Sequence, residues 1–297
     1  METRNVIMLR GLPASGKSSL AKEIMKGGGN YYRVNRDHLR EMMYFSDWRG
    51  SREAMVISVE QLAATQILVA QGANLIIDDC NLGQKHEDLW RTFLTKLGEL
   101  NNFRYNFEIR VVDTPLEECI ARDAARERTV GRSVIVGMAM QYGLYNPKRV
   151  ILCDLDGTIA NLDHRLHYVP KEEGAKKDWK SFFAEIPNDT LIDKTAQMVQ
   201  AGIDDGCELF YISARPENYR EVTEEWLERV GAPDATALFM RRAHDKREDS
   251  LIKKELLNAY FPEKSVIECV FDDRPRVIRM WREEGLYVED CGDGIEF

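Results

Sequence analysis

The chain has 297 residues, of which 44% are hydrophobic and 31% charged, so it can form buried cores. This composition excludes global disorder, collagen and low-complexity classes, and the length favours two domains. The net charge of −9 is uneven, at +2 for residues 1–148 and −11 for 149–297, which argues against non-specific binding along nucleic acid but allows binding of a short strand end.

The sequence also bears on the compartment. It has no run of about 18 apolar residues, so we expect no membrane-spanning helix and no membrane partner. The start, METRNVIMLRG, enters an apolar strand pattern without a signal-peptide core, so we expect a cytoplasmic protein. Six cysteines occur without CxxC or zinc-ligand spacing, which predicts free thiols.

The first half alternates apolar strand patterns with helical ones. The predicted strands are 6–10, 31–35, 74–78 and 107–113. The predicted helices are 18–25, 36–44, 53–71, 87–100, one from Pro115 and one at 133–142. This alternation is typical of a parallel, doubly wound sheet.

A turn-forming stretch, GLYNPKR at 143–149, divides the chain, and we predict domains 1–146 and 147–297. The pattern then restarts, with strands at 149–157, 208–213 and 266–273 and helices at 216–230 and 250–260. Residues 161–188 interrupt it with mixed charges and aromatics, as an inserted cap would. The fold class is therefore α/β, with two doubly wound parallel-sheet domains and a small cap in the second.

GLPASGKS, residues 11–18, fits the pattern GxxxxGK[ST] between a predicted strand and a predicted helix. In this pattern the glycines let backbone N–H groups surround nucleotide phosphates. Lys17 is expected to reach the β- and γ-phosphates, Ser18 to hold Mg²⁺, and the helix N-terminus to add positive potential. The context favours a triphosphate site over an unliganded glycine turn.

Acidic residues follow two other strands of the first half. Asp37 should lie at the carboxyl edge of the sheet, where it could accept a proton from an attacking hydroxyl, and Arg40 one turn later could bind an acceptor phosphate. Asp78 and Asp79 should lie at the same edge, one to assist Mg²⁺ and the other to orient substrate. Each alone could equally be a helix cap or a surface charge.

Four arginines occur in the segment 122–132. At positions i and i+4 of a helix they would share one face and could close over the transferring phosphoryl group as a lid. The alternative is a solvated basic face. They are Arg122, Arg126, Arg128 and Arg132.

DLDGT, residues 154–158, ends the first strand of the second half. One aspartate can attack phosphorus while its neighbour protonates the leaving oxygen and then activates water. Anions beside a phosphate imply Mg²⁺. Later elements could complete this site: Asp272 and Asp273 the metal shell, Ser213 and Arg215 a phosphate clamp, and Lys253 a contact to the nucleophile.

The predicted cap carries histidines and aromatics. His164 and His167 lack a third metal ligand at suitable spacing, so a substrate-contacting or surface role is favoured. Trp179, Phe182 and Phe183 lie at helical spacing and are expected to form cap core rather than a base-stacking platform.

Both halves, in this order, resemble the phage polynucleotide kinase/3′-phosphatase family over nearly the whole chain. The carriers are GLPASGKS, VNRDHLR, IIDDCNL, RDAAR, DLDGT, ISAR, DKREDSLIKKE and FDDRPRVIRMW. The resemblance implies an adenylate-kinase-like P-loop fold followed by a haloacid-dehalogenase phosphatase fold. Segment 161–188 departs from the family pattern, and the choice between Lys253 and Lys254 is open by one position.

The resemblance also implies residue roles. Asp37 matches the general base, Arg126 the lid arginine, Asp154 the nucleophile, Asp156 the acid/base and Lys253 the third-motif lysine. Nucleotide binding would involve Gly11, Pro13, Ala14, Ser15, Gly16, Lys17, Ser18, Ser19, Arg122 and Arg126. Acceptor or substrate contacts would involve Arg40, Asp79, Thr158, Ser213 and Arg215, and metal ligands Ser18, Asp154, Asp156, Asp272 and Asp273.

The expected function is a bifunctional end-healing enzyme. It would use Mg²⁺ in both domains, move the γ-phosphate of ATP or another nucleoside triphosphate to a 5′-hydroxyl of RNA or DNA, and remove a 3′-phosphate or 2′,3′-cyclic phosphate. It would work with a separate ligase, in the host cytoplasm if phage-encoded, and a homo-oligomer is left open. The alternatives are a small-molecule kinase fused to a nucleotidase, and a non-catalytic ATP-gated binding module.

Overall fold

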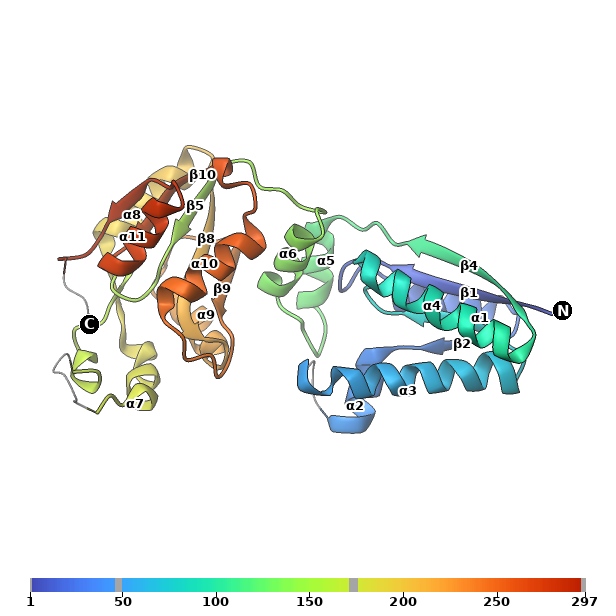
Figure 1. Cartoon of the computed structure of the whole chain (residues 1–297). Helices are drawn as coiled ribbons and strands as arrows, with labels where there is room; N and C mark the ends of the chain where they lie inside the picture. The colour runs from blue at the N-terminus through green and yellow to red at the C-terminus, as the bar shows by residue number, and fades with distance from the viewer. Residues whose placement is uncertain (1, 46–49, 171–175, 295–297) are drawn as a thin grey trace. The chain divides into compact units, whose positions relative to one another are not determined.

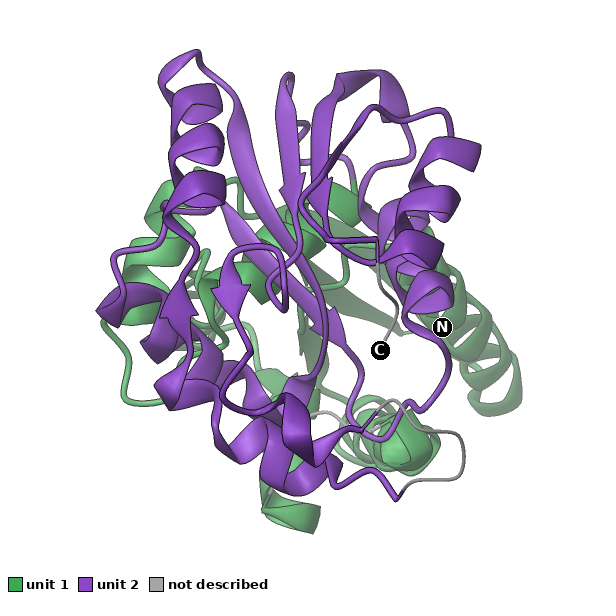
Figure 2. Ribbon diagram, turned by 90° about the vertical axis from the view of Figure 1, so that its left-hand side faces the viewer, with its two compact units in different colours: residues 1–142 green, residues 143–297 purple. Residues whose placement is uncertain are grey.

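The computed structural model describes residues 2–45, 50–170 and 176–294. It divides into two compact units, Met1–Tyr142 and Gly143–Phe297 (Figure 2), four residues before the expected boundary. Each unit has its own sheet and its own hydrophobic core.

Unit 1 is built on a four-stranded parallel sheet in the order β2-β3-β1-β4 (Figure 1). Successive residues of the central strand face opposite sides: Val6 and Met8 pack with one core cluster and Ile7 and Leu9 with another. A strand buried on both faces reads as a continuous apolar run, which is why this segment does not alternate with polar residues. The strands are β1 (Thr3–Arg10), β2 (Tyr31–Val34), β3 (Asn74–Asp78) and β4 (Arg104–Val111).

Helices cover both faces of this sheet, as a doubly wound fold requires. Ala21 of α1 packs on one face, and Leu68 and Trp90 pack on the other. The helices are α1 (Lys17–Lys26), α2 (Arg36–Tyr44), α3 (Glu53–Thr65), α4 (Gln84–Asn101), α5 (Leu116–Ala124) and α6 (Arg132–Gln141). A short 3-10 helix at Gly50–Arg52 precedes α3, and a π-helix at Gln66–Ala70 follows it.

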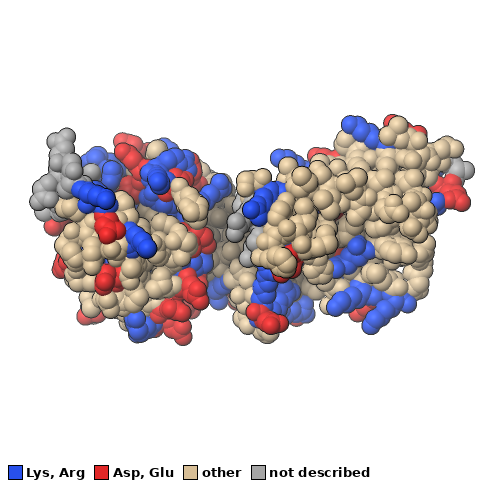
Figure 3. All heavy atoms as spheres, turned by 90° about the horizontal axis from the view of Figure 1, so that it is seen from below, with Lys and Arg blue, Asp and Glu red and all other residues tan. Residues whose placement is uncertain are grey.

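The helical stretch Gly50–Ala70 corrects the expectation that nothing here could span a membrane. Its length and its apolar composition are sufficient for a span. Within it, however, Glu60 is fully buried in an ion pair with Arg36, and Ala64 and Leu68 belong to the core of unit 1. Its outer side exposes Met55 and Leu62, and Figure 3 shows a largely uncharged face on this unit.

Unit 2 contains a five-stranded parallel sheet in the order β11-β10-β5-β8-β9. The strands are β5 (Val150–Cys153), β8 (Glu208–Pro216), β9 (Ala237–Arg241), β10 (Ile267–Asp272) and β11 (Val288–Asp290), and the helices are α8 (Asp193–Asp204), α9 (Arg220–Arg229), α10 (Asp249–Tyr260) and α11 (Pro275–Glu283). Because β5 is central, the residues that follow it lie between the carboxyl ends of β8 and β10. The α/β fold class with two parallel sheets is thus confirmed.

The insertion after β5 forms a small cap. Two short antiparallel strands, β6 (Ala160–Asn161) and β7 (Thr190–Leu191), form its base. Between them lie a 3-10 turn (Leu166–Tyr168), helix α7 (Trp179–Ala184) and a second 3-10 turn (Ile186–Asn188). Part of the expected cap, residues 171–175, lies outside the described residues.

Candidate functional site

The glycine-rich loop of unit 1 connects β1 to α1 in the expected conformation. Gly16 has φ +102°, a left-handed value that favours glycine, and a Cβ on Gly11 would lie 2.7 Å from Val112 O. The Gly11 N–H donates to Cys80 O at 3.0 Å, which joins this loop to the end of β3. The loop therefore cannot accept larger side chains at these two positions.

Lys17 is buried and folds back over the loop. Its Nζ donates to Gly11 O at 3.0 Å and Leu12 O at 2.6 Å, with Ser15 Oγ at 3.3 Å. The ammonium thus bonds to oxygens of its own loop, and the oxygens of a bound triphosphate could take their place. Pro13, Ala14 and Ser15 are buried within the loop, whereas Ser18 and Ser19 are exposed in the first turn of α1.

Asp37 lies in the first turn of α2, at the carboxyl edge of the sheet. Asn35 caps this helix, its Oδ1 accepting from the His38 N–H at 2.9 Å. The Asp37 side chain is 79% exposed, and its carboxylate accepts from Arg40 at 2.5 Å. Glu53 holds the other side of the same guanidinium at 2.6 Å. Asp37 is thus oriented and open to a hydroxyl arriving from solvent.

Asp78 and Asp79 follow β3 at the same edge, but other side chains already bind them. Asp78 is buried and pairs with Arg33 at 2.5 Å. Asp79 accepts from the Arg36 N–H at 2.9 Å, and the Arg36 guanidinium pairs with buried Glu60 at 2.9 Å. Burial raises the pKa of Glu60, and Asp79 raises it further against the opposing effect of Arg36. No sequence motif indicated Glu60.

The arginine segment differs from its expected form. Helix α5 ends at Ala124, so Arg122 and Arg126 do not share one helix face as predicted. The chain turns there because the buried Asp123 carboxylate accepts from the Val130 and Gly131 N–H groups, each at 2.9 Å. Arg122 still reaches the P-loop, donating to Ser15 O at 3.3 Å. Arg128 pairs with Glu41, and Arg132 begins α6.

In unit 2, Asp154 immediately follows the central strand β5. Its Oδ2 lies 2.9 Å from Lys253 Nζ, and the same ammonium lies 2.7 Å from Asp272 Oδ2. Lys253 is 2% exposed on α10, whereas Lys254 is 45% exposed and pairs with Glu284. The structure therefore places Lys253, rather than its neighbour, against the expected nucleophile.

Oxygens of Asp154, Asp272 and Asp273 lie within 4.8 Å of one another, all three residues buried. Burial raises the pKa of Asp154 to about 8, with Lys253 opposing and the neighbouring carboxylates adding to the rise. Burial and Asp272 raise the pKa of Asp273 to about 6. Three buried carboxylates lie near one ammonium, so their negative charge is not fully compensated. Carboxylate oxygens are hard donors, the kind of ligand that Mg²⁺ prefers.

The turn after Asp154 is shaped around this cluster. Gly157 has φ +83°, and a Cβ there would lie 2.2 Å from Asp273 Oδ2. Thr158 Oγ1 donates to Asp273 Oδ1 at 3.1 Å. Trp281 Nε1 donates to Asp272 Oδ2 at 3.0 Å. The glycine and the threonine of DLDGT thus position Asp273.

The Asp156 carboxylate binds two arginines and is not part of the three-carboxylate cluster. Arg215 donates to it at 2.6 and 2.9 Å, and Arg165 at 2.8 Å. Both guanidiniums also bind buried Asp189, Arg165 through two bonds of 2.6 Å. Burial would raise the pKa of Asp156, but the two arginines outweigh it and lower this pKa. A role of Asp156 as metal ligand stays a prediction.

Two residues at this site, Arg165 and Asp189, lie outside the motifs found in the sequence and come from the cap and its base. Asp249 of α10, within the run DKREDSLIKKE, pairs with Arg274 and Arg276. Ser213, fully buried within β8, accepts from the Arg215 N–H at 3.1 Å. The only sequence signal for the first two was a lone arginine and a lone aspartate flanking the cap.

Mg²⁺ should stabilise the protein through this cluster, and more at pH 8 than at pH 6. In the folded protein the pKa values of Asp154 and Asp273 exceed the ordinary pKa of an aspartate. The metal-free protein therefore loses stability as pH rises through about 6 and about 8. Mg²⁺ binds the deprotonated carboxylates and offsets that loss. We expect calorimetry of the full chain to show a rise of roughly 5 °C at Mg²⁺ about 100-fold above its dissociation constant.

Asp272→Asn should lose most of this gain, whereas Asp234→Asn, at an exposed position of the same unit, should keep it. An Mg²⁺ gain that is equal at both pH values and unchanged by Asp272→Asn would contradict the assignment.

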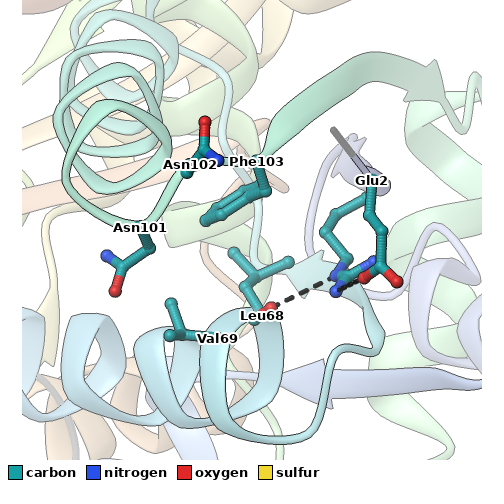
Figure 4. A pocket seen from close by; sticks show the side chains of 7 residues that line it. Glu2, Leu68, Val69, Asn101, Asn102 and Phe103 are labelled. Carbon is teal, nitrogen blue, oxygen red and sulfur yellow. Dashed lines mark hydrogen bonds and ion pairs between the residues drawn. The ribbon is translucent and has the colours of Figure 1, made fainter.

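A pocket of about 300 Å³ lies in unit 1 (Figure 4). Glu2, Arg4, Leu68 and Phe103 line it, with Arg4 donating to Leu68 O at 3.3 Å. It lies at the start of β1, the end of the strand opposite to the P-loop, and none of the expected site residues lines it.

Comparisons with known proteins match each unit separately. Residues 148–295 match the family described as the polynucleotide kinase PNKP phosphatase domain, and residues 6–144 match the AAA domain family. A protein of Autographa californica nuclear polyhedrosis virus, named "Putative bifunctional polynucleotide kinase/RNA ligase", is 28% identical. That match covers 99% of this chain but 44% of the relative, so the chain spans less than half of its length.

Solved structures were also compared. A "Structure of Pnkp1/Rnl/Hen1 complex" is similar at 25% identity, with TM-score 0.41, over 100% of this chain and 99% of that chain. A class C acid phosphatase from Bacillus anthracis is similar at 18% identity, with TM-score 0.35, over 50% of this chain and 68% of that chain. From the two family matches and the two sites, the chain is PNKP-like: an AAA-type P-loop kinase domain followed by a haloacid-dehalogenase phosphatase domain.

Proposed function

We propose that the chain is a bifunctional enzyme that heals the ends of broken RNA or DNA strands. Unit 1 moves the γ-phosphate of ATP, or of another nucleoside triphosphate, to a 5′-hydroxyl. Unit 2 removes a 3′-phosphate or 2′,3′-cyclic phosphate. This proposal rests on the match of residues 148–295 to the polynucleotide kinase PNKP phosphatase domain. The matched residues include the buried Asp154, Lys253 and Asp272, which contact one another.

In unit 1, Asp37 takes the proton of the 5′-hydroxyl as its oxygen attacks the γ-phosphorus. The bond between the γ-phosphorus and the bridging oxygen breaks, and the nucleoside diphosphate leaves with that oxygen. Lys17 binds the β- and γ-phosphates, and Arg122, which already reaches the loop, and Arg126 add positive charge. Ser18 would hold Mg²⁺, which supplies further charge neutralisation when bound. Arg40 and Asp79 orient the acceptor.

In unit 2, an Asp154 carboxylate oxygen attacks phosphorus, and the bond to the strand's 3′-oxygen breaks. Asp156 gives that oxygen a proton and then takes one from the water that hydrolyses the aspartyl-phosphate. Because Arg165 and Arg215 keep Asp156 ionised in this structure, substrate phosphate must draw Arg215 away before Asp156 can carry a proton. Mg²⁺ at Asp154, Asp272 and Asp273 would neutralise the accumulated charge.

The acidic unit 2 can still receive a polyanion. Although residues 149–297 carry a net charge of −11, Figure 3 shows Lys and Arg side chains interspersed with acidic ones on the visible face of unit 2. The Asp156 side chain is paired with two arginines at the site itself.

The partners belong to the same proposal. The named viral relative combines a polynucleotide kinase with an RNA ligase, which supports a functional link to a separate ligase for this chain. A phage origin, action in the host cytoplasm, a homo-oligomer and the absence of a membrane partner stay predictions from the sequence.

The proposal is tested by comparing oligonucleotides with free nucleosides and mononucleotides as substrates. With γ-labelled ATP and Mg²⁺, we expect label on a 5′-hydroxyl oligonucleotide and none on free nucleosides, and phosphate release from a 3′-phosphorylated oligonucleotide ahead of release from a mononucleotide. Label only on nucleosides would favour a small-molecule kinase fused to a nucleotidase. ATP binding without turnover on any acceptor would favour a binding module.

A further inference from the structure

The aromatic side chains of the cap do not all serve as its core. Phe182 of α7 is 2% exposed and belongs to the core of unit 2. Trp179, one turn earlier, is 45% exposed. The sequence predicted that these aromatics would form cap core, and the structure bears this out for Phe182 but leaves nearly half of the Trp179 side chain open to solvent.

Trp179 begins a continuous row of rings. Its indole stacks on Phe183, with centroids 5.9 Å apart and planes at 24°. Phe183 in turn contacts Tyr219, with centroids 4.9 Å apart. Phe183 and Tyr219 are each half-buried. We call Trp179, Phe183 and Tyr219 the aromatic row.

Neighbours of the aromatic row contact the proposed phosphatase site, through Phe182 on the cap side and Arg215 on the sheet side. On the cap side, Arg165 donates to Phe182 O at 3.3 Å and to Asp156 at 2.8 Å, and its guanidinium lies 4.2 Å from the Phe182 ring centroid. On the sheet side, Tyr219 lies four residues after Arg215, which also binds Asp156. A molecule with phosphate between Asp154 and Arg215 therefore has aromatic surface within reach.

Lysines flank Trp179 at the exposed end of the row, together with Asp178, which caps α7. Lys177 Nζ lies 5.7 Å from the Trp179 ring centroid, and Lys176 and Lys180 are exposed beside it. Exposed aromatic faces next to cations are the pattern that binds single-stranded nucleic acid, in which bases stack on rings and phosphates meet lysines. Exposed rings beside cations, in the same unit as the proposed phosphatase site, fit a single strand better than a protein or lipid partner.

We propose that the aromatic row is a base-stacking subsite that holds the last unpaired nucleobases of a strand whose 3′-phosphate occupies the phosphatase site. This inference rests on the proposed function and adds the specificity element that distinguishes a strand end from a small phosphate ester. Trp179 binds substrate in this account, and Lys177 contacts the backbone phosphates.

The experiment asks whether removing the Trp179 side chain and removing the terminal bases affect KM through the same contact. Two 3′-phosphorylated oligonucleotides are compared, one complete and one abasic at its last two nucleotides, with wild type and Trp179→Ala. We expect Trp179→Ala to raise KM for the complete strand about 5- to 150-fold with little change in kcat, and the abasic strand to show the same rise with wild type. For Trp179→Ala, removing the bases should add little more, because the lost contact is the same.

Trp179→Phe should recover most of the affinity, and Tyr287→Ala, at an exposed tyrosine by the start of β11, should behave as wild type. Equal effects of Trp179→Ala on both strands would overturn the subsite, as would a lower kcat on both strands with a lower melting temperature. If wild type hydrolyses p-nitrophenyl phosphate but neither strand, the proposed function itself fails.

Discussion

Replacing Asp154 with Asn should abolish phosphate release from a 3′-phosphorylated strand, by at least about a thousandfold in kcat, and leave kinase activity unchanged. Asn cannot form the acyl-phosphate bond, because its amide is not a nucleophile toward phosphorus at neutral pH. The kinase is spared because Lys17 and Asp37 belong to unit 1 and Asp154 to unit 2.

The same variant should fold normally. Asp154 lies among buried carboxylates that raise its pKa to about 8, so its ionised form is costly in the metal-free protein. A neutral side chain of the same shape removes one of these charges, and at pH 8 without Mg²⁺ the melting temperature should equal or exceed that of wild type. Phosphatase activity within tenfold of wild type would contradict the assigned nucleophile.

Replacing Asp37 with Asn should lower kcat for transfer to a 5′-hydroxyl by about 10²- to 10⁴-fold, the usual effect of losing a general base. The amide keeps the size of the side chain but cannot accept the hydroxyl proton. Because the side chain is 79% exposed and its partner Arg40 keeps Glu53, the melting temperature should not change.

The matched control is Glu99→Gln, an exposed carboxylate near the far end of α4, which should keep full kinase activity. The KM for ATP should also be unchanged in Asp37→Asn, since Lys17 and the P-loop bind the donor. A large rise in that KM with an unchanged kcat would instead assign Asp37 to nucleotide binding.

The fold was largely predictable, because parallel strands buried on both faces leave apolar runs that local patterns reveal. β5, with the sequence VILC, is an example, and Asp154 follows it directly. Strand β9, with the sequence ALFMR, and strand β11, with VED, were not predicted, since such short segments depend on their neighbours in the sheet. Helices α8 and α11 were also missed.

The sequence can nominate site residues where candidate chemistry concentrates in one segment. Lys17, Asp154 and the pair Asp272–Asp273 are predictions of this kind. The contacts around Asp79 and Asp156 could not be predicted, because they join residues distant in sequence: Glu60 reaches Arg36, and Asp189 reaches Arg165 and Arg215. A lone aspartate beside a 3-10 turn gives no sign of such a pairing.

The central claim is that one polypeptide holds two separate phosphorus chemistries. It is tested most directly on a single oligonucleotide with a 5′-hydroxyl and a 3′-phosphate, incubated with ATP and Mg²⁺ while each end is followed separately. Wild type should give a 5′-phosphate and a 3′-hydroxyl, Asp37→Asn only the 3′ change, and Asp154→Asn only the 5′ change. Loss of both reactions in either variant, with a melting temperature equal to that of wild type, would contradict two independent sites.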